Sequence, residues 1–426
     1  MKLDYGKNGI EVEIDPKWNT KIIHPVEQFP IENPIKAIRD AIKNPVGNLS
    51  LKAIIKNRKK IKSVCIVVSD ATRPVPTHLI LEGLMRELND YGIKEKDIGV
   101  LIATGLHRPS RKEEINRILG EISTRDVKII NHIATNKKSL VSIHNSNDEI
   151  PIYINKYYYE SDLKILTGYV EPHFFFGFSG GYKSIIPGLA GAETILANHS
   201  AEKIDSPYAR FGIQEKNPLP EHSSRHAKIV GVDFTINVCI NKDHEITQVA
   251  AGDVELVHNK LVDYQNKRIF KKIRKSFDIV VCGNGGYPLD LNLYQAVKSM
   301  AIGEMAVKRG GTIISVNECS EGIGKGQDKF KELIFSKKNP QEIYNKILQK
   351  EIVVPDQWQI QVLTRILMKA EIYIVSIMGE EEIGNIGLKY ANTVENAIKN
   401  SLNKHGRDAS ILILPNGPQV LPSINI

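Results

Sequence analysis

The sequence is poor in cysteine and has no pairing pattern among the cysteines that it contains. Four occur in 426 residues, they lie far apart, and no C-x-x-C pair is present. A zinc ribbon or a redox-active pair is therefore not expected. Most of them lie in or beside apolar runs, where buried thiols are common, and reduced thiols indicate a cytoplasmic protein. The four are Cys65, Cys239, Cys282 and Cys319.

Long apolar runs and concentrated basic stripes are also missing. No run approaches the roughly 18 residues that a membrane-spanning helix needs, and the N-terminus lacks the apolar core of a secretion signal. The formal net charge is +8, but the lysines are spread along the chain and no nucleic-acid-binding module is recognisable. We therefore expect neither a membrane nor a nucleic-acid partner, and the excess charge suits a small anionic substrate.

Two common ligand-binding signatures are broken. In GFSGGYKS, Tyr182 stands where a phosphate-binding loop needs glycine before its lysine. In CGNGGYP, Pro288 stands where the third glycine of the dinucleotide fingerprint belongs, so a conventional NAD site is weakly supported. A protein-only zinc site needs three or four ligands, and we cannot assemble such a set from the sequence.

Apolar strands alternate with helical patterns along the chain, which indicates parallel α/β sheets. The expected strands include residues 61–70, 98–103, 127–130, 163–168, 234–240, 245–250, 277–282, 312–316, 372–378 and 409–414. The expected helices include residues 34–43, 51–57, 77–91, 112–119, 253–274 and 292–308. The fold class that follows is α/β, with two Rossmann-like α/β domains and a cofactor and substrate cleft between them.

The domain boundary is expected after the charged helix that ends near residue 274. Residues 1–272 would form the N-terminal α/β domain, with the candidate cofactor lysine and catalytic histidines, and residues 273–426 the C-terminal α/β domain. The last roughly 20 residues are candidates to return to the N-terminal domain.

Three expected strands end in polar signatures, SDATRP, ATGLHRP and TGYVEPH. Ligands bind outside the carboxyl ends of strands in open α/β sheets, so Asp70, Arg73, His107 and His173 would converge if these strands are neighbours. Two imidazoles flanking one carbon could exchange protons from either side, and Arg73 suits a carboxylate. Alternatively, each histidine binds backbone in its own loop and Arg73 forms a surface ion pair.

A glycine-rich run, residues 171–200, holds Lys183 between His173 and His199. Glycine loses more backbone freedom on folding than any other residue, so this density indicates backbone that approaches a bound group closely. The lysine and the histidines point to an anionic or metal-bearing group. His199 fits a single protein ligand of a metal held mostly by a cofactor, or, alternatively, a surface or helix-capping histidine.

Taken together, these motifs resemble those of the nickel-pincer lactate racemase family. The matching segments are SDATRPVP (69–76), ATGLHRP (103–109), EPHFFFGFSGGYKSIIPGLAG (171–191), ANHS (197–200) and LYQAVKSM (293–300). They occur in the family's order and span most of the chain. The resemblance implies a racemase that interconverts L- and D-lactate.

The resemblance also implies a cofactor, the nickel pincer nucleotide, which is a pyridinium-3,5-bisthiocarboxylic acid mononucleotide with Ni(II). Lys183 would attach it covalently as a thioamide, and His199 would complete the square plane of the nickel, a geometry that suits Ni(II) with soft ligands. The nucleotide would be held by Asp70, Ala71, Thr72 and Arg73. The enzymes that mature this cofactor would be partners.

The catalytic groups implied by the resemblance are His107 and His173, an acid–base pair acting while hydride moves between the substrate and the cofactor through a bound 2-keto acid. The implied substrate contacts are Arg73, Gln295, Lys298 and Trp358. Gln295 and Lys298 stand three residues apart on one expected helix, and therefore on one face.

The identity of the 2-hydroxy acid stays open, because relatives act on lactate and on larger or dicarboxylic acids. Phe174, Phe175, Phe176 and Tyr294 favour a small apolar pocket and hence a methyl side chain, although such pockets discriminate weakly between homologues. Two other classes are an NAD-dependent 2-hydroxy acid oxidoreductase, with net oxidation, and a non-catalytic carrier, without turnover.

Overall fold

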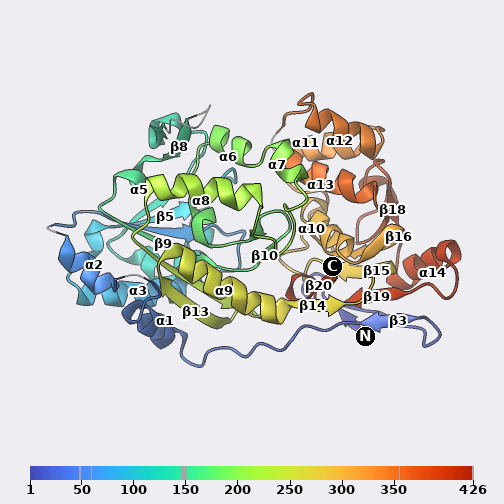
Figure 1. The fold of residues 1–426 in the computed structure, drawn as a ribbon, viewed down its shortest axis with the longest axis horizontal. Helices are drawn as coiled ribbons and strands as arrows, with labels where there is room; N and C mark the ends of the chain where they lie inside the picture. The colour runs from blue at the N-terminus through green and yellow to red at the C-terminus, as the bar shows by residue number, and fades with distance from the viewer. Residues whose placement is uncertain (48, 59, 145–150, 355, 425–426) are drawn as a thin grey trace. The chain divides into compact units, whose positions relative to one another are not determined.

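The computed structural model describes residues 1–47, 49–58, 60–144, 151–354 and 356–424. The chain forms two compact units, which we call the larger unit (Gln28–Gln265) and the smaller unit (Met1–Glu27 with Asn266–Ile426). The blue N-terminal segment therefore shares a unit with the orange and red end of the chain (Figure 1). Among the described residues, no helix is long and apolar enough to cross a membrane.

A six-stranded sheet organises the larger unit, in the order β13-β12-β9-β4-β5-β6. Neighbouring strands are parallel except β12 and β13, which form the expected antiparallel hairpin. The strands are β4 (Val64–Ser69), β5 (Ile98–Ala103), β6 (Lys128–Asn131), β9 (Leu163–Tyr169), β12 (Phe234–Ile240) and β13 (Ile246–Gly252). Short two-stranded pairs are β7 (Leu140–Ile143) with β8 (Ile152–Asn155) and β10 (Pro172–His173) with β11 (Gly177–Phe178).

Helices cover both faces of this sheet, so its strands are apolar on both sides. One apolar core joins the strands to α1 (Pro34–Lys43), α2 (Leu51–Asn57), α3 (Thr77–Asp90) and α4 (Lys112–Leu119). The other face packs against α5 (Lys156–Glu160), α6 (Ala192–Asn198), α8 (Pro218–Val230) and the start of α9 (Val254–Ile269), and Figure 1 shows α5, α6 and α8 together on that side. The short helix α7 (Ala201–Asp205) follows α6.

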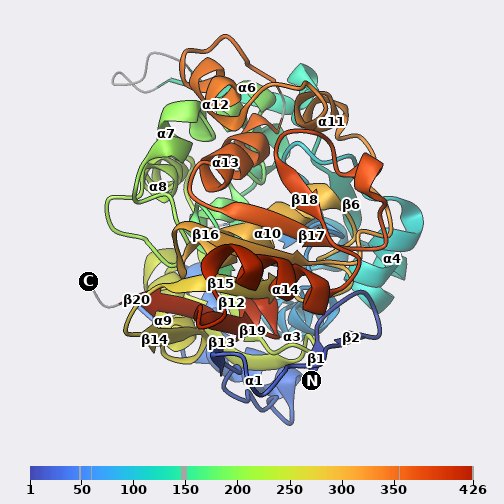
Figure 2. The ribbon, with the colours of Figure 1, turned by 90° about the vertical axis from the view of Figure 1, so that its right-hand side faces the viewer.

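The smaller unit has a six-stranded parallel sheet in the order β18-β17-β16-β15-β19-β3. Its strands are β3 (Thr20–Ile22), β15 (Phe277–Gly283), β16 (Val307–Val316), β17 (Glu371–Val375), β18 (Leu388–Tyr390) and β19 (Ile411–Leu414). Its helices are α10 (Leu293–Glu304), α11 (Asp328–Ile334), α12 (Pro340–Leu348), α13 (Gln357–Leu367) and α14 (Val394–His405). Helix α14 lies across one face of the sheet, as Figure 2 shows, and shares a core with its strands.

The structure divides the chain differently from the expected boundary at residue 272. The first 27 residues belong to the smaller unit, because β3 pairs with β19 and because Leu3 and Val12 join its core. The last residues also stay in this unit, since β20 (Leu421–Ile424) pairs in parallel with β14 (Phe270–Ile273). Two further short strands, β1 (Lys2–Leu3) and β2 (Ile10–Glu11), form a hairpin.

Candidate functional site

The three strands with polar ends are neighbours in the larger unit, in the order β9-β4-β5. Ser69 pairs with Ala103, so β4 and β5 end level with each other. The residues that follow therefore meet: Asp70 Oδ2 lies 2.7 Å from His107 Nδ1. The predicted approach of these two side chains at the carboxyl edge of the sheet is confirmed.

The Asp70 carboxylate is buried and held in one orientation. Its Oδ1 accepts from Thr72 N at 3.2 Å and from Thr72 Oγ1 at 2.6 Å, which leaves Oδ2 for His107. Burial by itself would raise the pKa of Asp70, but the hydrogen bond and charge of His107, with Arg73 and Thr72, hold this pKa below its ordinary value. Asp70 is therefore an ionised acceptor beside the half-exposed ring of His107.

Arg73 lies at the end of the same turn. Its Nη1 donates to Thr72 Oγ1 at 3.1 Å, and its positive charge helps to lower the pKa of Asp70. The carbonyl of Ala71 accepts from Arg117 at 3.4 Å. The turn from Asp70 to Arg73 thus presents a carboxylate, a hydroxyl and a guanidinium at one edge of the sheet.

His173 lies in the β10–β11 hairpin, directly after β9. Its Nδ1 accepts from the backbone N–H of Phe176 at 3.2 Å. The rings of Phe174 and Phe175 lie 5.0 and 4.6 Å from the His173 ring, centroid to centroid. Both phenylalanines are buried, as is Phe176, so His173 lies among apolar aromatic side chains.

Tyr169 and Glu171 form a hydrogen-bonded pair that the sequence analysis did not single out. The Tyr169 hydroxyl donates to the Glu171 carboxylate. Burial raises the pKa of Tyr169, the Glu171 charge raises it further, and Arg73 opposes them, so this pair lies within electrostatic range of the Asp70–Arg73 turn. Their position at the carboxyl end of β9 was the signal that could have found them.

The loop that carries Lys183 is fixed by three polar contacts. The Ser179 hydroxyl donates to the Tyr169 carbonyl at 3.0 Å, and His258 Nε2 donates to the Ser179 carbonyl at 3.0 Å. Gly181 N donates to Asn237 Oδ1 at 3.0 Å. These contacts come from different elements, so the backbone before Lys183 is held from several sides.

Lys183 and His199 share an aromatic neighbour. The Lys183 ammonium lies 5.0 Å from the centroid of the Phe176 ring, and the His199 ring lies 6.4 Å from it. His199 is the C-cap residue of α6, as the alternative interpretation held, yet its side chain is buried. Burial, with the nearby charge of Lys183, lowers the pKa of His199 to about 3, so its ring is neutral.

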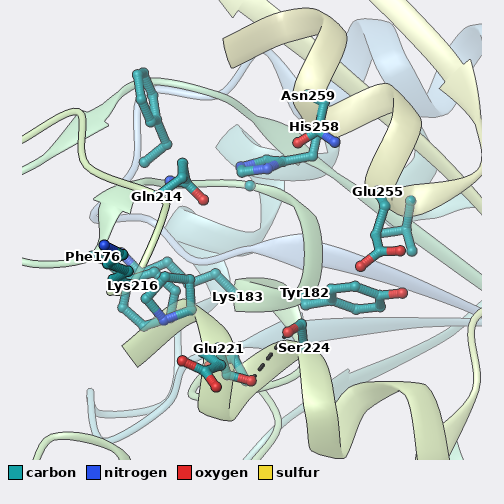
Figure 3. A pocket seen from close by; sticks show the side chains of 15 residues that line it. Phe176, Tyr182, Lys183, Gln214, Lys216, Glu221, Ser224, Glu255, His258 and Asn259 are labelled. Atoms are coloured by element: carbon teal, nitrogen blue, oxygen red, sulfur yellow. Dashed lines mark hydrogen bonds between the residues drawn. The ribbon is translucent and has the colours of Figure 1, made fainter. Parts of the chain in front are cut away.

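A cavity of about 300 Å³ opens beside Lys183. Figure 3 shows His258 and Gln214 on one side of it and Glu221 and Ser224 on the other. Other residues in its wall are Phe176, Phe178, Tyr182, Lys216, Glu255 and Asn259. The cavity gives Lys183 a polar surrounding of both charge signs.

Further polar residues lie behind His199. Asn198 Nδ2 lies 3.0 Å from His222 Nδ1 and donates to the Ser223 hydroxyl at 3.2 Å. His222 and His226 have the H-x-x-x-H spacing, a signal that the sequence carries, and their rings lie 4.4 Å apart on α8. Among the described residues, no group of three or more histidine, cysteine, aspartate or glutamate side chains could hold a metal ion.

The remaining expected site residues belong to the smaller unit. Gln295 and Lys298 lie on α10, and Trp358 lies on α13, which packs against α10. The Gln359 side chain donates to the carbonyl of Tyr294, which joins the two helices. The structure thus groups these residues within their own unit, while their approach to His107 and His173 stays a prediction.

Comparisons with known proteins agree over most of the chain. Residues 5–212 match the lactate racemase N-terminal domain, and residues 272–421 match the lactate racemase C-terminal domain. The chain is 36% identical over 387 residues to the lactate racemase of Thermoanaerobacterium thermosaccharolyticum, covering 90% of this chain and 89% of that protein. It is 34% identical to the lactate racemase of Lactiplantibacillus plantarum, covering 99% of both chains.

Solved structures give the same result. The lactate racemase apoprotein from T. thermosaccharolyticum superimposes with a TM-score of 0.91 at 33% identity, over 99% of both chains. A Thermotoga maritima protein has a TM-score of 0.69 at 21% identity, over 92% of this chain and 99% of that one, and shares the fold. From these matches, the chain belongs to the lactate racemase family and is an isomerase.

Proposed function

We propose that this protein interconverts L- and D-lactate by hydride transfer to and from a nickel pincer nucleotide attached to Lys183. The observation that carries this proposal is the arrangement in the larger unit. A histidine paired with a buried carboxylate and a second histidine follow neighbouring strands, and a lysine stands beside a buried neutral imidazole. Acid–base groups and a cofactor anchor are the parts that such a racemase needs.

The donor set fits the cofactor. A metal binds the neutral form of imidazole, and the low pKa of His199 keeps that form at all ordinary pH values. Lys183 supplies an amine next to it, and the Asp70–Arg73 turn supplies hydrogen-bonding groups for a nucleotide. When bound, the nickel pincer nucleotide supplies the acceptor and donor for the C2 hydride.

In this proposal, side chains of the protein transfer the protons and offset the charge of the substrate carboxylate. His107 would take the hydroxyl proton of one enantiomer, which leaves a bound 2-keto acid after loss of the C2 hydride, and His173 would give a proton back to the same oxygen when the hydride returns to the other face of C2. Arg73 and Lys298 offset the carboxylate charge, and Gln295 and Trp358 orient the substrate. Approach of the smaller unit to the larger would bring these last residues to the site.

Lactate is the proposed substrate because the side chains nearest to His173 are apolar. Phe174 and Phe175 pack on its ring, and Tyr294 packs edge-on against Phe330 at 5.5 Å. Another 2-hydroxy acid with the same cofactor is the alternative, since apolar pockets separate close homologues by only about 1–3 kcal/mol. The four cysteines are buried as reduced thiols, which suits the cytoplasm.

An NAD-dependent oxidoreductase is disfavoured by how the smaller unit uses its own glycine-rich loop. Tyr287 N donates to the Gly6 carbonyl at 2.8 Å, and a Cβ at Gly286 would lie 2.8 Å from the same oxygen. The N-terminal segment therefore occupies the space beyond β15 where a dinucleotide would bind in a Rossmann fold.

The decisive experiment compares lysine variants made together with the cofactor maturation enzymes. Intact mass, nickel content and conversion of L- to D-lactate are measured for the wild type, Lys183→Ala and Lys216→Ala. Lys216 is the matched control because it lines the same cavity.

We expect a covalent adduct, one nickel per chain and D-lactate from the wild type and Lys216→Ala, with all three lost in Lys183→Ala. An adduct without lactate turnover would indicate that the substrate is another 2-hydroxy acid. Absence of both adduct and nickel, under conditions that load a known family member, would refute the proposal.

A further inference from the structure

The two histidines differ in what their Nδ1 atoms contact. His107 Nδ1 lies 2.7 Å from Asp70 Oδ2, whereas His173 Nδ1 lies 3.2 Å from the backbone nitrogen of Phe176. An ionised carboxylate can only accept a hydrogen bond, and a backbone N–H can only donate one. The proton of a neutral ring is therefore on Nδ1 in His107 and on Nε2 in His173.

We infer that Asp70 is a positioning residue that sets the tautomer of His107, while the hairpin backbone sets the opposite tautomer in His173, so that the two acid–base groups are chemically unequal. Asp70 would act through His107, in addition to any contact with a nucleotide.

The surroundings of Asp70 make it suited to this role. Thr72 donates twice to Oδ1, so the carboxylate cannot rotate without losing both hydrogen bonds. The charged groups around it are His107, Arg73 and, at longer range, Arg108. A fixed anion beside the ring stabilises the imidazolium that forms when His107 takes a proton.

His173 has the opposite surroundings. Its neighbours are aromatic rings, and the titratable groups that also lie close to Phe175 and Phe176 are His199 and Lys183. A second proton on His173 would set an N–H against the Phe176 N–H, which costs the hydrogen bond there. A neutral His173 therefore carries its proton on Nε2, and the imidazolium form that its acid–base role requires is less favourable than that of His107.

The catalytic consequence rests on the proposed function. L- and D-lactate are equally stable, so kcat/KM must be equal in the two directions at every pH. A difference between the two histidines can then be detected only in kcat and KM taken separately. Both constants would differ between the two directions, and by the same factor.

Tautomers can be measured on the apoprotein, without the cofactor. Long-range ¹H–¹⁵N correlation spectra of protein labelled in its histidine rings distinguish Nδ1–H from Nε2–H. His107→Gln and His173→Gln variants assign the two signals. His132 and His258 serve as internal references, because their Nε2 atoms donate to the Ala190 and Ser179 carbonyls.

Asp70→Asn is the informative variant. Both Thr72 donors face Oδ1, so the amide oxygen takes that place and the amide NH₂ faces His107 Nδ1. We expect His107 to change from the Nδ1–H or doubly protonated form to the Nε2–H form, with His173 and both references unmoved. Unmoved references show that the variant is folded.

The inference is overturned if His107 keeps its wild-type signal in Asp70→Asn, or if His173 carries its proton on Nδ1. These outcomes do not depend on nickel, so they are separate from failure of the racemase proposal. On loaded enzyme, kcat/KM per bound nickel should fall by roughly 10²-fold, the usual contribution of a positioned acid–base group. Unchanged kcat/KM despite a changed tautomer would refute the catalytic role of Asp70.

Discussion

Gly180 shows how little room surrounds the loop that carries Lys183. Its φ is +79°, and an added Cβ would lie 2.8 Å from Asn237 Oδ1 and 2.9 Å from the Tyr169 carbonyl. Gly180→Ala should therefore cost about 2–5 kcal/mol, from backbone strain and overpacking together. Urea unfolding measures this loss, and the nickel content after co-production reports on the placement of Lys183.

Gly231 offers a matched control, since its φ is +85° and nothing lies within 4 Å of its added Cβ. Gly231→Ala should lower the free energy of unfolding only through backbone strain, by about 1–3 kcal/mol, and should leave nickel loading unchanged. Equal losses in the two variants would contradict the close approach at Gly180.

His132 makes the stability of the protein depend on pH. The ring is fully buried, donates from Nε2 to the Ala190 carbonyl and lies 3.1 Å from Asn155 Nδ2. Burial lowers its pKa from 6.5 to about 4, so the unfolded chain binds a proton first as pH falls. The free energy of unfolding should therefore drop by about 2–3 kcal/mol between pH 7 and pH 4.5 through this residue alone.

The comparison is made by urea unfolding of His132→Gln and of His24→Gln, which changes an exposed histidine. The first variant should lose part of the pH dependence, and the second should keep all of it. A pH dependence that is identical in the wild type and His132→Gln would rule out His132 as its source.

The meeting of Asp70 with His107 could be predicted from the sequence, because buried parallel strands that end in polar residues place those residues at one edge of a sheet. The histidine tautomers could not be predicted, because they depend on the turn that directs the Thr72 donors to Asp70 Oδ1. Of the three phenylalanines after His173, Phe176 lines the cavity beside Lys183, whereas Phe174 and Phe175 pack on the His173 ring. Sequence gives their apolar character but not whether a ring lines a cavity or encloses a neighbour.

At the scale of the helices and strands, a capping hydrogen bond at the N-terminus of α10 should affect substrate binding. The Asn292 side chain accepts from Gln295 N at 3.0 Å, on the helix that carries Gln295 and Lys298. Asn292→Ala should cost about 1 kcal/mol of stability. If these side chains contact the substrate, KM for lactate should rise about fivefold, which corresponds to about 1 kcal/mol.

Asn33 caps α1 in the same way, accepting from Lys36 N at 3.0 Å. Asn33→Ala should lose similar stability without changing KM, and Asn292→Ser should restore most of the lost affinity. Equal effects of both alanine variants on KM would argue against a substrate role for the start of α10.

The end of α9 shows where an element-level prediction was wrong. The sequence suggested a helix to residue 274, but the helix ends at Ile269 and Phe270–Ile273 forms β14. The partner strand, β20, lies about 150 residues further along the chain. Local periodicity carries no information about such a distant partner, so propensity alone extended the helix.

At the scale of the whole molecule, the two units should differ in independence. The cores of the larger unit draw only on residues between 28 and 265, whereas the core of the smaller unit includes Leu3 and Val12. Residues 28–265 expressed alone should fold cooperatively, as circular dichroism and thermal unfolding would show. Residues 28–426 should lose the β3 edge strand and aggregate through the exposed β19.

Size-exclusion chromatography of these two fragments and the full chain makes the comparison. A monomeric 28–426 fragment with the melting temperature of the full chain would contradict the assignment of the first residues to the smaller unit. The same outcome would support the prediction that the first residues belong to the N-terminal domain. The sequence could not place them with the smaller unit, because β3 and β19 are too far apart for any local pattern to connect them.

The position of β3 also has a consequence for synthesis on the ribosome. This strand begins at residue 20, and β19 begins at residue 411. The ribosome therefore synthesises about 390 residues after β3 before its partner strand is available. At ordinary rates of translation this takes roughly 20–80 s. The larger unit is complete long before then, so Lys183 and His199 reach their places before most of the smaller unit has been synthesised. Cofactor loading could accordingly begin on a nascent chain.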